Sequence, residues 1–421
     1  ANLLQAFDAV AQNIPTVAVA ASFQKDPQVL MAHPKQGIDK FEDLRKLTIL
    51  VSKEGILDSR EMSIWRYTAL LPVSDPGFQP TPLHAVGMTP VYRPPLLEKT
   101  LGMRELWIKD ESRNPSASFK DRASAVVIAR AIETDVKTIV AASTGNAGAA
   151  MACMSASVAR KAIILAPRSA PPAKIAQLLT FGAQVILVEG TYDQAFDLSI
   201  EASHEFGWYN RNTGYNPFTV EGKKTAAYEI WEQVLRHMPE RSEPLTVFIP
   251  VGDGNILSGL AKGFKDLLHL GWIDRLPRLV GVQADGSAAI ANAFFSRSDT
   301  ITPISATTLA DSISVDLPRD GLRALKAVRE TGGWYVTVPD EEILKAIPAL
   351  GKAGLFVEPA AATAYAGLLK SLREGLLDPA APALVLCTGS GLKDVRAATM
   401  AVNPAPVIEP TLAALKGLLH G

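Results

Sequence analysis

The sequence has little cysteine and almost no net charge. Its two cysteines, Cys153 and Cys387, lie in apolar surroundings and form no Cys-x-x-Cys pair. They exclude a disulfide framework, so we expect a cytoplasmic protein without a structural metal. The 42 lysines and arginines nearly balance the 43 aspartates and glutamates, which leaves a formal net charge of -1. This balance argues against nucleic acid as a partner.

Long hydrophobic runs are also missing. No uninterrupted apolar run reaches the roughly twenty residues that a membrane-spanning helix needs. The Ala-rich stretch from Val10 to Phe23 imitates a secretory signal, but Pro15 interrupts it and no lysine or arginine precedes Lys25. We therefore expect no membrane partner. With 48% hydrophobic residues, the chain can bury a large core.

From about residue 106 onward, short β-branched runs alternate with longer helical patterns. This alternation is typical of βαβ units around a parallel sheet, and several runs are apolar throughout, as in a sheet covered on both faces. We predict helices at 121–132 and 222–237. The expected strands are 106–109, 138–141, 162–165, 185–188, 247–250, 279–283, 334–338 and 384–387. The pattern predicts an α/β fold with a doubly wound sheet.

One segment joins a strand to a helix and carries a lysine at the junction. Residues 111–122 read Glu-Ser-Arg-Asn-Pro-Ser-Ala-Ser-Phe-Lys-Asp-Arg. Ser118 offers a hydroxyl to cap the helix. Lys120 would stand at a rigid point beside the helix start, where its positive charge is destabilised. Taken alone, it would more readily be a solvated lysine with Asp121 and Arg122 as surface neighbours.

Three loops follow expected strands, and the first two precede helices. They are Ser143-Thr144-Gly145-Asn146, Gly252-Asp253-Gly254-Asn255 and the run that begins at Thr388-Gly389-Ser390. Ligands bind at the carboxyl ends of strands in open α/β sheets. Amides at a helix start attract anions, and glycines let the main chain bend and expose its amides. Each loop alone could be an ordinary helix cap or a tight turn.

Together these segments resemble the threonine synthase family of pyridoxal phosphate (PLP) enzymes. That family carries an Asn-Pro-Thr-Gly-Ser-Phe-Lys-Asp-Arg run, from which residues 114–122 depart only at Ser116 and Ala117. The resemblance extends from about Ser59 to Ala397 and includes Glu358-Pro359-Ala360. It implies that Lys120 is the catalytic residue and carries PLP as a Schiff base.

The resemblance also implies roles for the loops. Ser143 and Thr144 would bind the substrate carboxylate, and Asn146 the 3-hydroxyl of PLP. Thr388 would bond the ring nitrogen, which favours elimination and replacement over transamination, although Ser390 could share or take this role.

The glycine loop is expected to hold the cofactor phosphate through Gly252, Asp253, Gly254 and Asn255. The family commonly has a longer Gly-Asn-x-Gly-Asn here. A carboxylate facing the phosphate would repel it, so we expect Asp253 to point away.

Substrate contacts depart more from the family pattern. Asn216, like its family counterpart, is expected to reach the substrate, but the family arginine that follows it is Thr219 here. Ser314 likewise replaces an arginine in a second family pattern. Losing guanidinium groups removes bidentate phosphate recognition. Lys223 or Arg168 could replace the lost charge, or both could be ordinary surface residues.

The implied architecture is a two-domain PLP fold type II enzyme, similar to the tryptophan synthase β superfamily, with parallel or mixed sheets covered by helices. We expect a small domain at 115–212 and a large PLP-binding domain at 57–114 and 213–421. Residues 1–56 would be an appended segment, because residues 10–54 resemble a fragment of a periplasmic binding protein for thiamine-precursor-type ligands. The family is generally dimeric, so we expect a homodimer.

The resemblance implies conversion of O-phosphohomoserine and water to threonine and phosphate. One alternative on the same scaffold is β-elimination or replacement on serine, threonine or O-phosphoserine, as in dehydratase-like or cysteate synthase-like enzymes. Another is a non-catalytic PLP-binding paralogue. In either enzymatic case the partner is a small amino-acid substrate.

Overall fold

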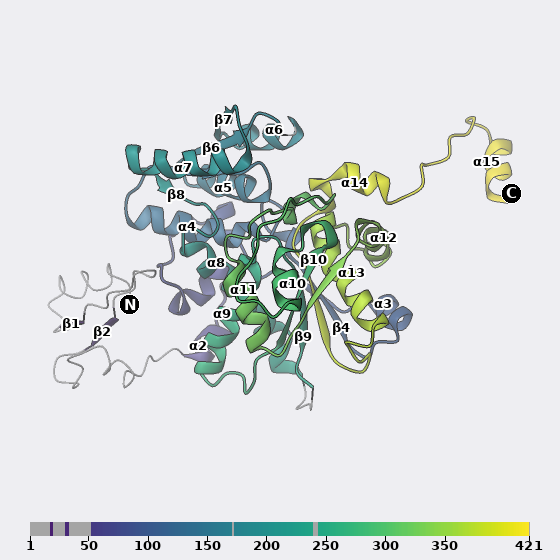
Figure 1. The fold of residues 1–421 in the computed structure, drawn as a ribbon, viewed down its shortest axis with the longest axis horizontal. Coiled ribbons are helices and arrows are strands. Elements are labelled where there is room, and N and C mark those ends of the chain that lie inside the picture. The colour runs from purple at the N-terminus through teal and green to yellow at the C-terminus, as the bar shows by residue number, and fades with distance from the viewer. Residues whose placement is uncertain (1–16, 20–29, 33–51, 171, 239–242, 421) are drawn as a thin grey trace.

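The computed structural model describes residues 17–19, 30–32, 52–170, 172–238 and 243–420. Within them, two sheets lie one above the other in Figure 1, each packed between helices. The large sheet has the order β11 (Tyr335–Val338), β10 (Arg278–Ala284), β9 (Thr246–Pro250), β12 (Ala383–Cys387), β4 (Leu106–Asp110) and β3 (Val91–Tyr92). The small sheet has the order β7 (Gln184–Val188), β6 (Lys161–Pro167), β5 (Thr138–Ala142) and β8 (Tyr209–Asn210). Within these two sheets, all strand pairs are parallel except β3 with β4, so loops after the parallel strands gather at one edge of each sheet.

The helices follow the strands in βαβ order. The small sheet carries α4 (Lys120–Glu133), α5 (Asn146–Ser157), α6 (Pro172–Thr180) and α7 (Tyr192–Phe206). Around the large sheet lie α2 (Lys53–Leu57), α3 (Pro95–Leu101), α8 (Phe218–Gln233), α9 (Asn255–His269), α10 (Ala289–Phe295), α11 (Gly321–Glu330), α12 (Asp340–Gly351), α13 (Pro359–Arg373) and α14 (Val395–Met400). Helix α8 packs against both α4 and α9, and so joins the two layers of the molecule.

Both faces of the large sheet are buried, because alternate side chains of each strand enter different hydrophobic clusters. Val247 and Ile249 of β9 pack on the side of α8 and α9, whereas Phe248 packs on the side of α12 and α13. Leu384 and Val385 of β12 divide in the same way. The two-residue period of a strand therefore explains why these runs are apolar throughout.

The structure confirms all eight expected strands to within about two residues, a normal tolerance for element ends. Helix α4 matches its expected range, while α8 begins at Phe218 rather than Gly222. The short strands β3 and β8 were not expected. The domain bounds at 57, 115 and 213 stay a prediction. Most of residues 1–56 lie outside the described residues; the described part comprises the antiparallel pair β1 (Val17–Val19) and β2 (Leu30–Ala32) and residues 52–56, where α2 begins.

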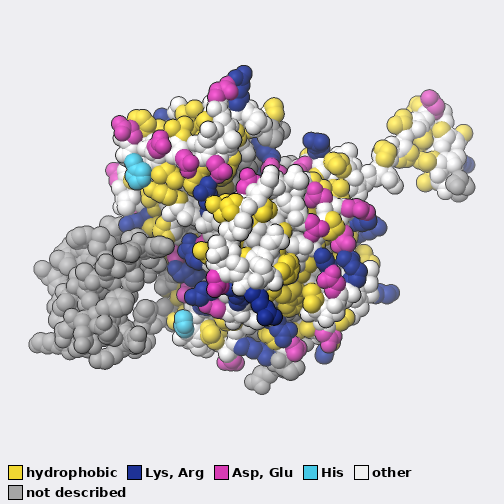
Figure 2. Space-filling model, in the orientation of Figure 1, with side chains coloured by type: hydrophobic (Ala, Val, Ile, Leu, Met, Phe, Trp, Pro, Cys, Tyr) yellow, Lys and Arg dark blue, Asp and Glu magenta, His cyan; other side chains and the backbone are white. Residues whose placement is uncertain are grey.

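The described chain ends in a helix, α15 (Leu412–His420), that stands apart from the body in Figures 1 and 2. Among the described residues, none of the helices is both long and apolar enough to span a bilayer.

Candidate active site

Lys120 is the first residue of α4, and its loop is fastened to the loop that follows β12. The amide of Phe119 donates to the Thr388 carbonyl at 2.8 Å, and the Ser390 amide donates to the Ala117 carbonyl at 3.1 Å. The expectation that Ser118 caps the helix is wrong. Phe119 is the N-cap residue, and the buried Ser118 hydroxyl has no partner among the described residues.

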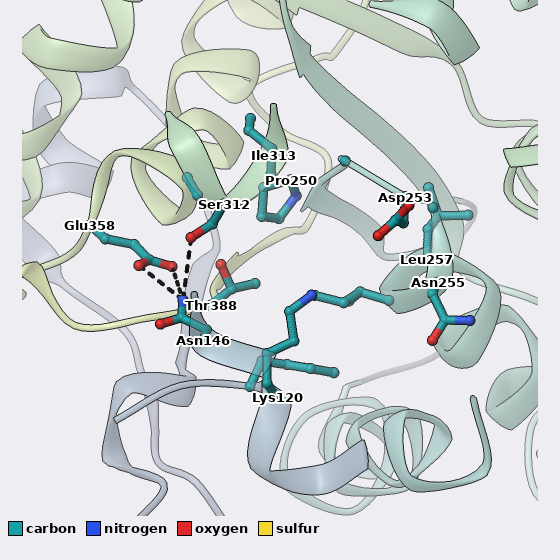
Figure 3. A pocket seen from close by; sticks show the side chains of 15 residues that line it. Lys120, Asn146, Pro250, Asp253, Asn255, Leu257, Ser312, Ile313, Glu358 and Thr388 are labelled. Carbon is teal, nitrogen blue, oxygen red and sulfur yellow. Dashed lines mark hydrogen bonds between the residues drawn. The ribbon is translucent and has the colours of Figure 1, made fainter. Parts of the chain in front are cut away.

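A pocket surrounds the Lys120 side chain, and its walls come from loops at the carboxyl ends of β4, β5, β9 and β12 (Figure 3). It holds about 520 Å³ of empty space, its open mouth included. The lining residues include seven that the sequence predicted: Lys120, Asn146, Gly252, Asp253, Gly254, Asn255 and Thr388.

The charge on Lys120 is disfavoured in this pocket. Burial lowers the pKa of the Lys120 amine, the carboxylate of Asp253 opposes that effect, and Arg211 adds to it. A lowered pKa increases the unprotonated fraction of the amine, which is the nucleophilic and basic form.

Asp253 points into the pocket, toward Lys120, so the expectation that it points away is wrong (Figure 3). Its orientation is fixed by the segment before α11. The Arg319 amide donates to its Oδ1 at 3.2 Å, and the Asp320 amide donates to its carbonyl at 3.0 Å.

Glu358 is a pocket residue to which the sequence assigned no role. It is 4% exposed, and both carboxylate oxygens accept hydrogen bonds from Asn146 Nδ2, at 2.9 and 3.0 Å (Figure 3). Burial raises the pKa of the Glu358 carboxyl. The Glu358-Pro359-Ala360 run was the signal that could have found it, since Pro359 starts α13 and leaves Glu358 at the helix entrance.

The glycine loop between β9 and α9 presents amides without acceptors. Among the described residues, no acceptor is found for the backbone amides from Gly252 to Leu257. Gly254 has φ of 87°, a left-handed conformation that favours glycine, and a Cβ there would lie 2.8 Å from that of Ala324. Free amides at the start of a 15-residue helix suit a phosphate group.

Thr388 and Ser390 have different surroundings. Thr388 lines the pocket and is 7% exposed, whereas the Ser390 hydroxyl accepts a hydrogen bond from the Leu392 amide at 3.3 Å. The geometry therefore favours Thr388 as the hydroxyl that faces a cofactor ring.

Only one of the two residues expected to bind the substrate carboxylate lies in a pocket near Lys120. Thr144 lines an adjoining pocket that shares Asn146 and Glu358 with the first. Ser143 lines neither pocket, because its hydroxyl accepts hydrogen bonds from the amides of Gly145 and Gly148 at the start of α5.

Asn216 lies in a separate aromatic hollow and does not line the pocket of Lys120. Its side chain donates to the Asn210 carbonyl and accepts from the Phe218 amide, which fixes the entry to α8. This placement gives no support to a substrate contact by Asn216.

The surface interpretation of Asp121 and Arg122 is wrong, since both are fully buried. Arg122 makes a bidentate pair with Glu111, at 2.8 Å for both bonds, and a second pair with Glu229. Lys109 Nζ lies 2.8 Å from Glu229 Oε2. We call Lys109, Glu111, Arg122 and Glu229 the ion cluster. Its residues come from β4, the turn that follows β4, α4 and α8.

The two residues named as replacements for lost charge differ sharply. Lys223 is fully buried, so its interpretation as a surface charge is wrong. Arg168 is exposed and pairs with Glu189 at the molecular surface, away from the pocket.

These features fit the cofactor that the resemblance implies. The pocket offers the half-buried Lys120 side chain, a helix start with unsatisfied amides for a phosphate, the amide oxygen of Asn146 for a ring hydroxyl and the Thr388 hydroxyl for a ring nitrogen. The partnerless Ser118 hydroxyl is a further donor beside Lys120.

Comparison with known proteins also indicates a pyridoxal-phosphate dependent enzyme. The family model "Pyridoxal-phosphate dependent enzyme" matches residues 83–389. A curated threonine synthase of Methanocaldococcus jannaschii is 40% identical over 90% of this chain and 92% of its own. One of Methanosarcina acetivorans is 32% identical over 97% of this chain and 99% of its own, so that match extends into the first 56 residues.

Solved structures support the fold alone. A threonine deaminase of Solanum lycopersicum superposes with a TM-score of 0.66 at 22% identity, over 85% of this chain and 94% of its own. Maize serine racemase superposes with a TM-score of 0.62 at 21% identity, over 79% and 91%. The match at 40% identity over nine-tenths of the chain shows the family as well as the fold. The chain belongs to the threonine synthase family of pyridoxal-phosphate dependent enzymes.

Proposed function

We propose that this protein converts O-phosphohomoserine and water to threonine and inorganic phosphate, with Lys120 as its catalytic residue. The observation that carries the proposal is the convergence on one pocket of Lys120, Asn146, Thr388 and the free amides after β9. The family shown by the comparisons supplies the reaction class, a PLP-dependent lyase.

PLP supplies an electron sink that stabilises negative charge developing on the substrate's carbon atoms. Lys120 would carry the cofactor and move protons through Nζ. Burial lowers the pKa of Lys120, which keeps part of the amine unprotonated and able to accept a proton from the substrate α-carbon. Asn146 would orient the ring, and Thr388 would face its nitrogen.

Substrate is best placed between the two adjoining pockets. The amides of Thr144, Asn146 and Ala147 have no acceptors among the described residues, and they lie at the start of α5, where a carboxylate is stabilised. Ser143 would act as a positioning residue, because its hydroxyl holds the Gly145 and Gly148 amides of this turn in place. Glu358 holds a proton to higher pH than an exposed glutamate would, next to Asn146.

A second candidate reaction is β-elimination or replacement on serine, threonine or O-phosphoserine. The observation that favours it is Thr219, which is buried and uncharged where the resemblance leads one to expect an arginine. The decisive experiment compares release of inorganic phosphate from O-phosphohomoserine with formation of 2-oxo acid from threonine and serine. Phosphate release with threonine as product supports the proposal; oxo-acid formation without phosphate release refutes it.

We also propose that the protein is a cytoplasmic homodimer that acts on a small amino acid. The family resemblance supports the dimer, and two free, buried cysteines support a reducing compartment.

A further inference from the structure

Two buried cations beside Lys120 form no ion pair with a carboxylate among the described residues. Lys223 is 0% exposed and its hydrogen-bond partner is the neutral amide oxygen of Asn255. Arg211 is 1% exposed, and its Nε and Nη1 donate to the hydroxyls of Ser124 and Thr213, each at 3.1 Å. A buried charge is expensive unless it is paired, so these two residues need an explanation.

The Arg211 guanidinium also retains an unused donor. Its buried Nη2 has no hydrogen-bond partner in the described part of the chain. Buried polar atoms are nearly always satisfied, and a partnerless one commonly marks a missing ligand or water.

Lys223 lies under the glycine loop. It is one helical turn after Thr219 on the same face of α8, and the Asn255 oxygen accepts from both side chains. Asn255 is the first residue of α9, directly beyond the loop whose amides have no acceptors. Asp320 does not neutralise Lys223, because its oxygens accept from Asn255 Nδ2 and Arg323 Nε.

The three cations also affect one another. Burial lowers the pKa of Lys223 well below its usual range, and the charges of Lys120 and Arg211 lower it further, against the opposing effect of Asp253 and Asp320. Burial likewise lowers the pKa of Arg211 to about 10. An anion placed among them would relieve this repulsion.

We propose that Lys223 and Arg211 form a binding site for a phosphate group beside Lys120, and we call them the cationic pair. Lys223 comes from α8 of the large layer, and Arg211 from the segment after β8 of the small layer. The site places the charge that Thr219 lacks one turn further along the same helix face. Its ligand chemistry is a phosphate monoester or free phosphate, whose source is the cofactor, or the substrate and its product.

This inference rests on the proposed function for its physiological ligand, but the test is independent of turnover. Lys223→Gln keeps a donor for the Asn255 oxygen and removes the charge. Arg211→Gln removes the other charge, so each cation is tested alone if one variant does not fold. Lys224→Gln is the matched control, since Lys224 is a buried neighbour on the same helix that is paired with Glu221 and Asp266.

Two measurements on the holoenzyme distinguish the sources. Titration calorimetry with inorganic phosphate reports the substrate and product source, and the rate of cofactor loss on dilution, followed by visible absorbance, reports the cofactor source. Removing a charged hydrogen bond should weaken one of these interactions about ten- to a hundred-fold in both charge-removing variants. Lys224→Gln should leave both unchanged.

The proposal is overturned if folded Lys223→Gln and Arg211→Gln proteins keep both phosphate affinity and cofactor retention, or if Lys224→Gln loses as much as they do. A wild-type protein that releases no phosphate from O-phosphohomoserine would refute the proposed function, yet calorimetric binding of phosphate through the cationic pair would still stand.

Discussion

Two buried groups of charges flank the start of α4, and they differ in how completely they are paired. In the ion cluster, Arg122 and Lys109 are matched by Glu111 and Glu229, and all four side chains are fully buried. In the cationic pair, the hydrogen-bond partners that the described part of the chain offers to Lys223 and Arg211 are all neutral. The first group is complete within the protein, whereas the second is complete only with a ligand.

The contrast is clearest between consecutive residues of α8. Burial would lower the pKa of Lys224, but Glu221 and Asp266 outweigh it and raise that pKa, whereas burial and neighbouring cations lower the pKa of Lys223. The same residue type on the same helix is therefore structural in one position and available for binding in the next. Pairing, and not burial, separates the scaffold from the site.

The largest expected effect follows from replacing Lys120, which lies beside the cationic pair. Lys120→Ala should lower turnover of O-phosphohomoserine by at least about 10³-fold, because proton transfer alone contributes about 10²–10⁴ and the attachment point of the cofactor is also lost. It should also abolish the visible absorbance of lysine-bound PLP. An unchanged thermal transition would show that the fold is retained, and retained turnover would refute the role of Lys120.

Breaking the ion cluster should instead lower the free energy of unfolding. Glu229→Gln removes the carboxylate that Arg122 and Lys109 share, and uncompensated buried charges typically reduce stability by about 3–5 kcal/mol. The free energy of unfolding from denaturant titration measures this effect. Arg373→Met, which breaks the half-exposed pair with Glu342, is the control and should cost less than about 1 kcal/mol. Equal losses of unfolding free energy in both variants would show that the buried ion cluster stabilises the fold no more than the half-exposed pair does.

Asp121 precedes Arg122 of the ion cluster in α4, and its carboxyl should make the free energy of unfolding depend on pH. Burial raises the pKa of its carboxyl from 3.8 to about 6, although hydrogen bonds from Ser116 lower it. Between those values the folded state binds a proton that the unfolded state does not, so stability falls as pH rises from 4 to 6, by up to about 3 kcal/mol. Asp121→Asn cannot titrate and should lose this slope.

The measurement compares unfolding free energies of wild type and Asp121→Asn across pH 4 to 7, so contributions of other carboxyls cancel. A constant difference between the two proteins across this range would show that the pKa of Asp121 is not raised.

Much of this arrangement followed from sequence because it depends on local patterns. Strand ends, glycine loops and the segment containing Lys120 are contiguous in the chain, and a parallel sheet brings such loops to one edge. Seven expected site residues consequently line one pocket. The side-chain direction of Asp253 was missed, because residues near 319 and 320, remote in sequence, determine it.

Residues whose role depends on pairing were harder to predict. Lys223 and Lys224 are adjacent lysines. Glu221, three residues before Lys224 on the same helix, is a local signal for one of its pairs, but Asp266 reaches it from α9. Arg211 has no motif around it. Asn216 was assigned to substrate although backbone groups two and six residues away occupy its side chain. Partnership across elements is a property of the tertiary structure, and no single segment contains it.

The smallest expected effect concerns Ala117, in the loop that precedes Lys120. Ala117 has φ of 62°, a left-handed conformation that costs an alanine about 1–2 kcal/mol and a glycine almost nothing. The unfolded state of a glycine variant gains about 0.4–1 kcal/mol of conformational freedom, which offsets part of the relief. Ala117→Gly should therefore raise the free energy of unfolding by at most about 1 kcal/mol.

Ala159→Gly is the matched control, because Ala159 has φ of 53° and follows α5, outside the pocket of Lys120. Similar gains in both variants, measured by denaturant titration, would assign the effect to backbone strain. If Ala117→Gly alone also weakened cofactor retention, the alanine would be holding the Lys120 loop against the Ser390 amide, since the Ala117 carbonyl accepts that bond. A loss of stability at position 117 would contradict strain there and would make the rigidity of this loop part of the site.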